Sequence, residues 1–149
     1  MSNKLNFKKM KTANKLFLVL MVLPFVFISC GNSIAKQMKE EMQTLKSQCP
    51  QYQGDGITMT DVNFYEREKI LEYVCSIDGV DASVFEAMKD EMVEIMKEAM
   101  VEALNNDLST LEKFSIKTVV KRYDYRLRYI YTDTEGNILC EIEISKHDL

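Results

Sequence analysis

Residues 123–145 read YDYRLRYIYTDTEGNILCEIEIS, and this stretch decides how the chain is expected to fold. Apolar and polar side chains alternate in both halves, which is typical of strands that bury one face. The polar segment 134–137 lies between the halves and contains Gly136, as a hairpin turn requires. We therefore predict an antiparallel hairpin with one apolar face per strand: Tyr125, Leu127, Tyr129 and Tyr131 on the first, Ile138, Cys140, Ile142 and Ile144 on the second.

A second pair of strands is predicted upstream. Residues 57–65 (ITMTDVNFY) and 70–77 (ILEYVCSI) are rich in β-branched and aromatic side chains and flank a polar turn at 66–69. In residues 70–77 one face carries Leu71, Tyr73, Cys75 and Ile77. These segments indicate a second hairpin, preceded by a loop that contains Gly54 and Gly56.

The remaining segments favour helices. Apolar residues recur at spacings of three and four after Ser33, and this pattern ends before the Cys49-Pro50 pair. Ser83 with Glu86 forms a capping box for a helix that runs to residues 105–106. A second box, Ser109 with Glu112, opens a shorter helix with Leu111, Phe114 and Thr118 on one face.

The predicted order is helix, hairpin, helix, helix, hairpin. Hairpins combined with helices predict an α+β fold, in which an antiparallel sheet of two hairpins carries the helices on one face. The length of residues 30–149 fits a single domain.

The N-terminal segment predicts export. The apolar run 16–29 contains Pro24 and is shorter than the roughly 20 residues that a membrane-spanning helix needs. Five lysines precede it, and the first acidic residue is Glu40. A basic start, a short apolar run and a small residue before the cleavage point indicate a secretory signal peptide over residues 1–29.

The end of this run, Phe27-Ile28-Ser29-Cys30-Gly31, resembles the lipobox of bacterial lipoproteins, although Phe27 stands where that family usually has leucine. The resemblance implies that Cys30 is thioether-linked to diacylglycerol and becomes the mature N-terminus. Gly31, in place of an aspartate, implies the outer membrane of a Gram-negative envelope, facing the periplasm. The whole layout is similar to small uncharacterised envelope lipoproteins. The alternative is an ordinary signal peptide with Cys30 as a free thiol.

The charge of the mature chain limits its partners. Five of the 19 basic residues and none of the 23 acidic ones precede Cys30, so residues 30–149 carry a formal charge of −9. A chain this acidic repels nucleic acid and anionic head groups. We therefore expect no nucleic-acid partner, and membrane attachment through the lipid on Cys30 alone.

Four methionines follow one another at a spacing of four: Met88, Met92, Met96 and Met100. Thioethers can bind Cu(I), but acidic residues repeat two positions out of step and so occupy the opposite side of the helix. We interpret the methionines as a core face and the acidic residues as a solvated face, and we predict no metal site.

The sequence offers little for catalysis. The single histidine, His147, lies in a terminal tail that is expected to fray, and no Cys-x-x-Cys pair or glycine-rich phosphate loop is present. We predict a protein without cofactor that is not an enzyme; the alternative is a small envelope hydrolase or redox factor with unidentified residues. At most one disulfide can form among the three remaining cysteines, Cys49, Cys75 and Cys140. We favour the alternative that they are free thiols, which act as small buried hydrophobic side chains.

Two arginines are the candidate partner-binding residues. Arg126 and Arg128 fall on the side of their strand opposite the tyrosines, and arginine forks suit carboxylates. If the tyrosine side of the strand is buried, as the alternation favours, the arginine pair is exposed and can contact an acidic partner. If the tyrosine side is instead exposed, the tyrosines form an aromatic binding patch. The sequence thus predicts a lipid-anchored, non-catalytic binding or accessory module for an envelope protein or small ligand.

Overall fold

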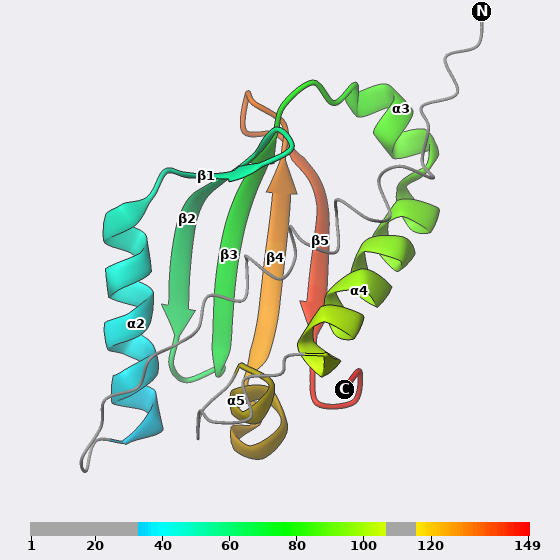
Figure 1. Ribbon diagram of the computed structural model, residues 1–149. Helices are drawn as coiled ribbons and strands as arrows, with labels where there is room; N and C mark the ends of the chain where they lie inside the picture. Colours follow the sequence, from blue (N-terminus) through cyan, green and yellow to red (C-terminus); the bar gives the residue numbers. More distant parts are fainter. Residues whose placement is uncertain (1–32, 107–115) are drawn as a thin grey trace, which may run out of the picture.

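The computed structural model describes residues 33–106 and 116–149. These residues form an α+β fold with a five-stranded sheet in the order β1-β2-β3-β4-β5 (Figure 1). The predicted fold class is therefore confirmed. The elements are α2 (Ile34–Gln48), β1 (Gln51–Gly54), β2 (Ile57–Tyr65), β3 (Ile70–Ile77), α3 (Ala82–Ala87), α4 (Lys89–Asn105), α5 (Ile116–Tyr123), β4 (Arg126–Thr132) and β5 (Ile138–Ile144).

Both predicted hairpins are present, but the way they join was predicted wrongly. β2 pairs antiparallel with β3, and β4 pairs antiparallel with β5. Between the hairpins, β3 and β4 run parallel, with Tyr73 opposite Tyr129. Parallel neighbours need a crossover connection. The chain from α3 to α5 forms this crossover and brings β4 back to the same end of the sheet at which β3 begins, so the sheet is mixed rather than antiparallel throughout.

One strand was missed. The segment predicted as a loop contains β1, which pairs with β2 through Gln51 and Met59. Asp55 and Gly56 make the connecting turn and both have positive φ, a conformation that favours glycine at position 56. β1 has only four residues, so its sequence is too short to show an alternating pattern.

The helices agree with the prediction in part. α2 begins after Ser33, whose hydroxyl accepts the Lys36 N–H, and ends before Cys49. The single helix expected from Ser83 is divided at Met88 into α3 and α4. Its cap is Asp81, whose carboxylate accepts the N–H groups of Ser83 and Val84, rather than the Ser83–Glu86 box. The second predicted box, Ser109 with Glu112, lies outside the described residues.

The core lies on the tyrosine face of the sheet, as expected. Leu127 is fully buried, and the Tyr73 and Tyr129 rings stack with their centroids 5.0 Å apart. Side chains from all four described helices join the same cluster: Met38 and Met42 of α2, Phe85 of α3, Met100 and Leu104 of α4, and Ile116, Val119 and Val120 of α5. Figure 1 shows α2 along the β2 side of the sheet and α4 along the β5 side. The helices thus pack on one face.

The methionine series is only partly a core face. Met100 is buried, Met92 and Met96 are half-buried, and Met88 is 37% exposed. The buried residues of α4 are Met100 and Leu104, near its C-terminal end, whereas Met88 lies at the break that precedes the helix. The interpretation of the methionines as a core face is therefore confirmed for Met100, holds in part for Met92 and Met96, which pack half-buried against the core, and is wrong for Met88.

Candidate interaction surfaces

The reactive side chains do not converge on one site. His147 is exposed on the segment that follows β5. Within residues 33–106 and 116–149, no group of three or more His, Cys, Asp or Glu side chains is placed to hold a metal ion. Across the same residues, no helix combines the length and the apolar character needed to cross a membrane.

The tail that carries His147 is held in place, contrary to the expectation that it frays. Lys97 Nζ lies 2.8 Å from Asp148 Oδ1, and Lys121 Nζ donates to the Leu149 carbonyl at 2.9 Å. Partial burial by itself raises the pKa of Asp148, but hydrogen bonds from Lys97 and Ser145 outweigh it and leave this pKa below its ordinary value. Sequence reasoning missed these contacts because Lys97 and Asp148 are far apart along the chain.

The three described cysteines are free thiols. Cys75 on β3 and Cys140 on β5 both pair with Tyr131 of β4, so one strand separates them. Two strand spacings amount to about 10 Å, beyond the reach of a disulfide. Burial raises the pKa of Cys75 to about 12 and that of Cys140 to about 11, which keeps both sulfurs protonated.

We predict that these thiols differ strongly in reactivity. Cys49 is half-buried, whereas Cys75 and Cys140 are buried. In a Cys30→Ser chain, which removes the fourth thiol, we expect Cys49 to react first with a thiol-specific chromogenic reagent. Cys75 and Cys140 are expected to react only after denaturant is added. The measurement is the number of thiols modified before and after unfolding. Loss of two thiols before any reagent is added would instead reveal a disulfide and contradict the arrangement.

Arg126 and Arg128 lie on the face of the sheet opposite the tyrosines, but they are not an isolated basic pair. Arg126 donates to Glu143 at 2.9 Å. Arg128 lies among three carboxylates: Glu72 at 3.5 Å, Glu143 at 3.4 Å and Glu141 at 3.2 Å. The last contact is close enough for an ion pair, although the Arg128 Nε–H is not aligned for a hydrogen bond. Both arginine forks already have carboxylate partners.

Glu72 is the centre of this polar cluster. It is only 5% exposed and accepts hydrogen bonds from Asn63 and Tyr65, each at 3.1 Å, as well as from Arg128. Desolvation works against the positive charge of Arg128, but the attraction of Glu141 and hydrogen bonds to Glu143 and Glu72 raise its pKa above the ordinary value. Within the described residues, the charges of this cluster are therefore paired with one another.

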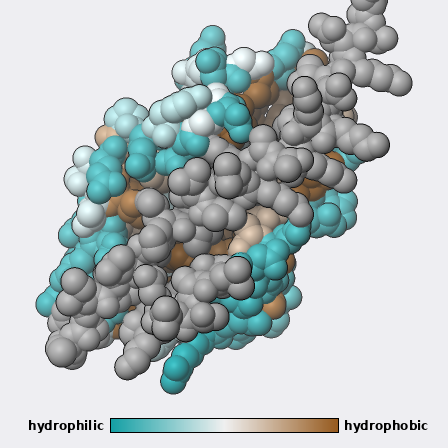
Figure 2. Space-filling view, in the orientation of Figure 1, coloured by the Kyte–Doolittle hydropathy of each residue, from teal (hydrophilic) through white to brown (hydrophobic). Residues whose placement is uncertain are grey.

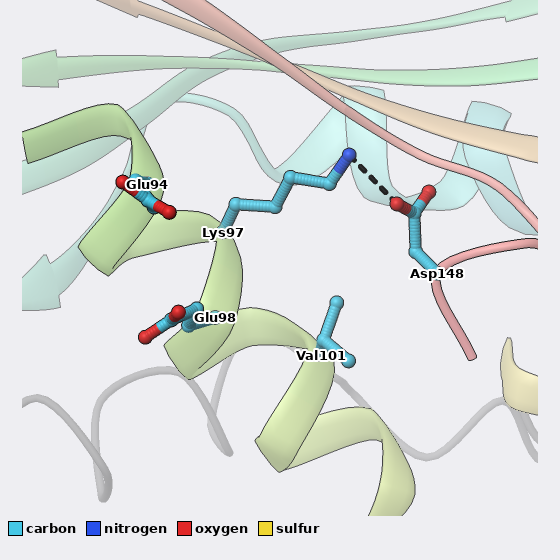
Figure 3. Close-up of a pocket in the computed structure, with 5 residues that line it drawn as sticks. All are labelled: Glu94, Lys97, Glu98, Val101 and Asp148. Atoms are coloured by element: carbon cyan, nitrogen blue, oxygen red, sulfur yellow. Dashed lines mark ion pairs between the residues drawn. The ribbon is translucent and has the colours of Figure 1, made fainter. Parts of the chain in front are cut away.

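An open depression of about 310 Å³ lies between α4 and the segment after β5. Figure 3 shows its lining, with Lys97 reaching across to Asp148 and with Glu94, Glu98 and Val101 on α4. Small-molecule sites are usually enclosed and mostly apolar. This depression is open rather than enclosed, which does not suit a small ligand.

Six large apolar side chains of the described residues are exposed. Figure 2 shows brown apolar surface where α3 and α4 lie in Figure 1. The exposed large apolar residues there are Val84 of α3, Met88 at the break between the helices and Ile95 of α4, and the others are Tyr52, Tyr65 and Ile138. Ile138 is the first residue of β5 and is 69% exposed.

Comparisons with known proteins give a family match and solved structures with a similar fold. The family described as "Domain of unknown function (DUF8479)" matches residues 32–140. No curated protein shows significant sequence similarity to the chain. A crystal structure of a Pseudomonas aeruginosa protein, described as a candidate secreted protein, has a TM-score of 0.56 at 11% identity and covers 79% of this chain and 98% of its own. The pilotin EpsS from the Vibrio vulnificus type 2 secretion system has a TM-score of 0.52 at 9% identity, over 92% of this chain and 96% of its own. At these identities the likeness is one of fold.

Proposed function

The chain belongs to the DUF8479 family, and we propose that it is a lipid-anchored accessory module of the bacterial cell envelope that binds a protein partner without catalysis. In this proposal residues 1–29 are removed as a signal peptide, Cys30 carries the lipid, and residues 30–149 form the module in the periplasm. The outer membrane is the proposed site of attachment, on the basis of the lipobox resemblance and of Gly31.

One observation carries the proposal: a pilotin of a type 2 secretion system has the same fold over 92% of this chain and 96% of its own. Together with the lipobox at Cys30, it supports an accessory role in the envelope for this chain.

The described surfaces favour a protein partner over a small ligand. The depression beside α4 is open rather than enclosed, and exposed apolar side chains lie on α3, α4 and the start of β5. The Arg126–Arg128 pair is occupied by Glu72, Glu141 and Glu143, and an acidic partner would have to displace these carboxylates. We therefore place the partner contact elsewhere on the module.

Gene deletion in the native host tests this function. We expect one envelope protein or complex to lose its normal abundance or membrane location, as measured by quantitative proteomics of separated inner and outer membranes. Wild-type protein is expected to restore it, and so is a Cys49→Ser control that keeps the proposed anchor. Restoration by a soluble Cys30→Ser chain, or an unchanged envelope in the deletion strain, would overturn the proposal.

A further inference from the structure

We propose that the end of the module that carries α5 faces the membrane, and that the basic outer side of α5 contacts anionic phospholipid head groups. This inference deepens the proposed function and rests on it in one respect, namely that Cys30 carries the lipid. It adds the orientation of the anchored module and a second surface that touches the bilayer.

Several elements meet at one end of the sheet, which we call the α5 end. Strand pairing brings the end of β2 and the starts of β3 and β4 together there, because Tyr65 is opposite Ile70 and Ile70 is opposite Arg126. α5 leads into β4, and Lys69 Nζ of the β2–β3 turn donates to the Tyr123 carbonyl of α5 at 3.1 Å. Figure 1 shows α5, this turn and the segment after β5 at the lower end of the molecule.

Helix α2 begins at the same end. Lys46, near the C-terminal end of α2, contacts Asp61 and Asn63 midway along β2, and the chain then enters β1, which pairs with the first half of β2. From Lys46 back to Ile34 the helix axis covers about 18 Å. The remaining part of β2, from Asn63 to Tyr65, covers only about 7 Å. The start of α2 therefore lies at the α5 end, as Figure 1 also shows.

A lipid on Cys30 holds this end close to the bilayer. Cys30 precedes Ser33, the first described residue, by three positions, and three residues of extended chain span at most about 11 Å. This reach is about half the length of α2 itself, which has 15 residues. Because α2 begins at the α5 end, that end faces the membrane, and α3, which follows the opposite end of β3, faces away from it.

α5 turns a basic side outwards. The helix contains no acidic residue and buries three apolar side chains in the core: Ile116, Val119 and Val120. Its basic residues are Lys117, which is half-buried, and Lys121 and Arg122, which are exposed. Among the residues that the structure describes, neither Lys117 nor Arg122 has a partner in an ion pair. These charges are therefore available to an anionic surface.

The other charges at the α5 end largely balance one another. Residues 66–69 of the β2–β3 turn carry two acidic and two basic side chains, and so do residues 36–41 at the start of α2. Asp124, after α5, forms an ion pair with Lys146 at 3.1 Å. α4 contributes Glu102 in its last turn. The surplus of positive charge at this end thus lies on α5.

Helices α3 and α4 carry the opposite charge. Residues 82–105 contain six acidic and two basic side chains, and Asp90 and Glu91 lie in the first turn of α4. An anionic bilayer repels these helices and attracts α5, so charge and tether favour the same orientation. The mature chain has a formal charge of −9, and three basic residues do not hold such a chain at a membrane by themselves. The contact acts on a module that the lipid already holds.

The test uses the lipidated mature protein, purified from membranes and reconstituted in nanodiscs of phosphatidylcholine and phosphatidylglycerol. A paramagnetic chelate on some of the head groups weakens the NMR signals of amides that lie near the bilayer. We expect the signals of Lys121 and Arg122 to be weakened at least about threefold more than those of Val84 and Phe85 in α3. Discs of phosphatidylcholine alone are expected to give a smaller difference, because the tether remains and the electrostatic attraction is lost.

Two double variants separate the charge of α5 from that of the whole chain. Lys117→Gln/Arg122→Gln breaks no ion pair among the described residues and keeps the buried side of α5, so it is expected to fold. In the mixed discs it should behave as the wild type does in phosphatidylcholine alone. The control, Lys46→Gln/Lys89→Gln, removes the same charge at positions away from α5 and is expected to keep the wild-type pattern.

Equal weakening of the α3 and α5 signals in the mixed discs would overturn the inference, and so would a wild-type pattern in the Lys117→Gln/Arg122→Gln variant. The intact mass of the same sample separates the two levels of the account. A lipidated protein without the expected orientation contradicts this inference alone, whereas a protein without lipid contradicts the anchor on which the proposed function also depends.

Discussion

Replacing Leu127 with alanine is expected to lower the free energy of unfolding by about 3–5 kcal/mol, at the upper end for a single core truncation. Leu127 is fully buried in the middle of the sheet, where it is paired with Leu71 on one side and Ile144 on the other. The neighbouring strands are fixed by their own hydrogen bonds and cannot close the cavity. Equilibrium urea denaturation, followed by circular dichroism, measures the loss.

Ile130→Ala is the matched control, because it truncates a residue of the same strand on the opposite face. Ile130 is half-buried, and we expect a loss of roughly 1–2 kcal/mol, about half that of a fully buried site. Equal losses at the two positions would mean that both faces of the sheet are covered, which would contradict the one-sided arrangement of the helices.

Cys30→Ser is expected to abolish membrane attachment, the largest effect on location that any single substitution in this chain should have. Serine lacks the sulfur that forms the thioether, and several acyl chains together make an anchor that a short peptide contact cannot replace. The negative charge of the mature chain gives no alternative attraction to anionic lipid. Fractionation of the native host is expected to show uncleaved precursor or soluble protein.

Cys49→Ser provides the control for this substitution, since it removes another thiol without touching the lipobox and is expected to remain with the membranes. If the Cys30→Ser chain stayed in the outer-membrane fraction in the same amount as the wild type, another part of the protein would have to supply the attachment.

The hairpins were predictable because alternation is a local signal. β2, β3 and the β4–β5 pair begin and end close to where the alternating patterns do. The parallel pairing of β3 with β4 was not predictable in the same way. It depends on where the chain between Ile77 and Arg126 returns, and no pattern within either strand records that path.

The helix break at Met88 shows a second limit of local reasoning. Ser83 with Glu86 is a good capping box, but Asp81 begins the helix two residues earlier and its carboxylate caps it. The methionine spacing continues through the break, so the sequence indicated one long helix and a uniform core face. Tertiary packing fully buries Met100 and Leu104, whereas Met92 and Met96 are only half-buried against the core.

The candidate surfaces were the least predictable part. The position of Arg126 and Arg128 opposite the tyrosines was predicted correctly from alternation. Their partners, Glu72 and Glu143, come from neighbouring strands and depend on sheet register, which the sequence does not show.

The measurement that tests the central claim most directly is the intact mass of the protein purified from the membrane fraction of its native host. A lipid-anchored module is expected to have the mass of residues 30–149 plus a diacylglycerol and its further acyl chain, with all of the added mass on the N-terminal peptide that contains Cys30. A soluble, unmodified mature chain with a free Cys30 thiol would contradict the account.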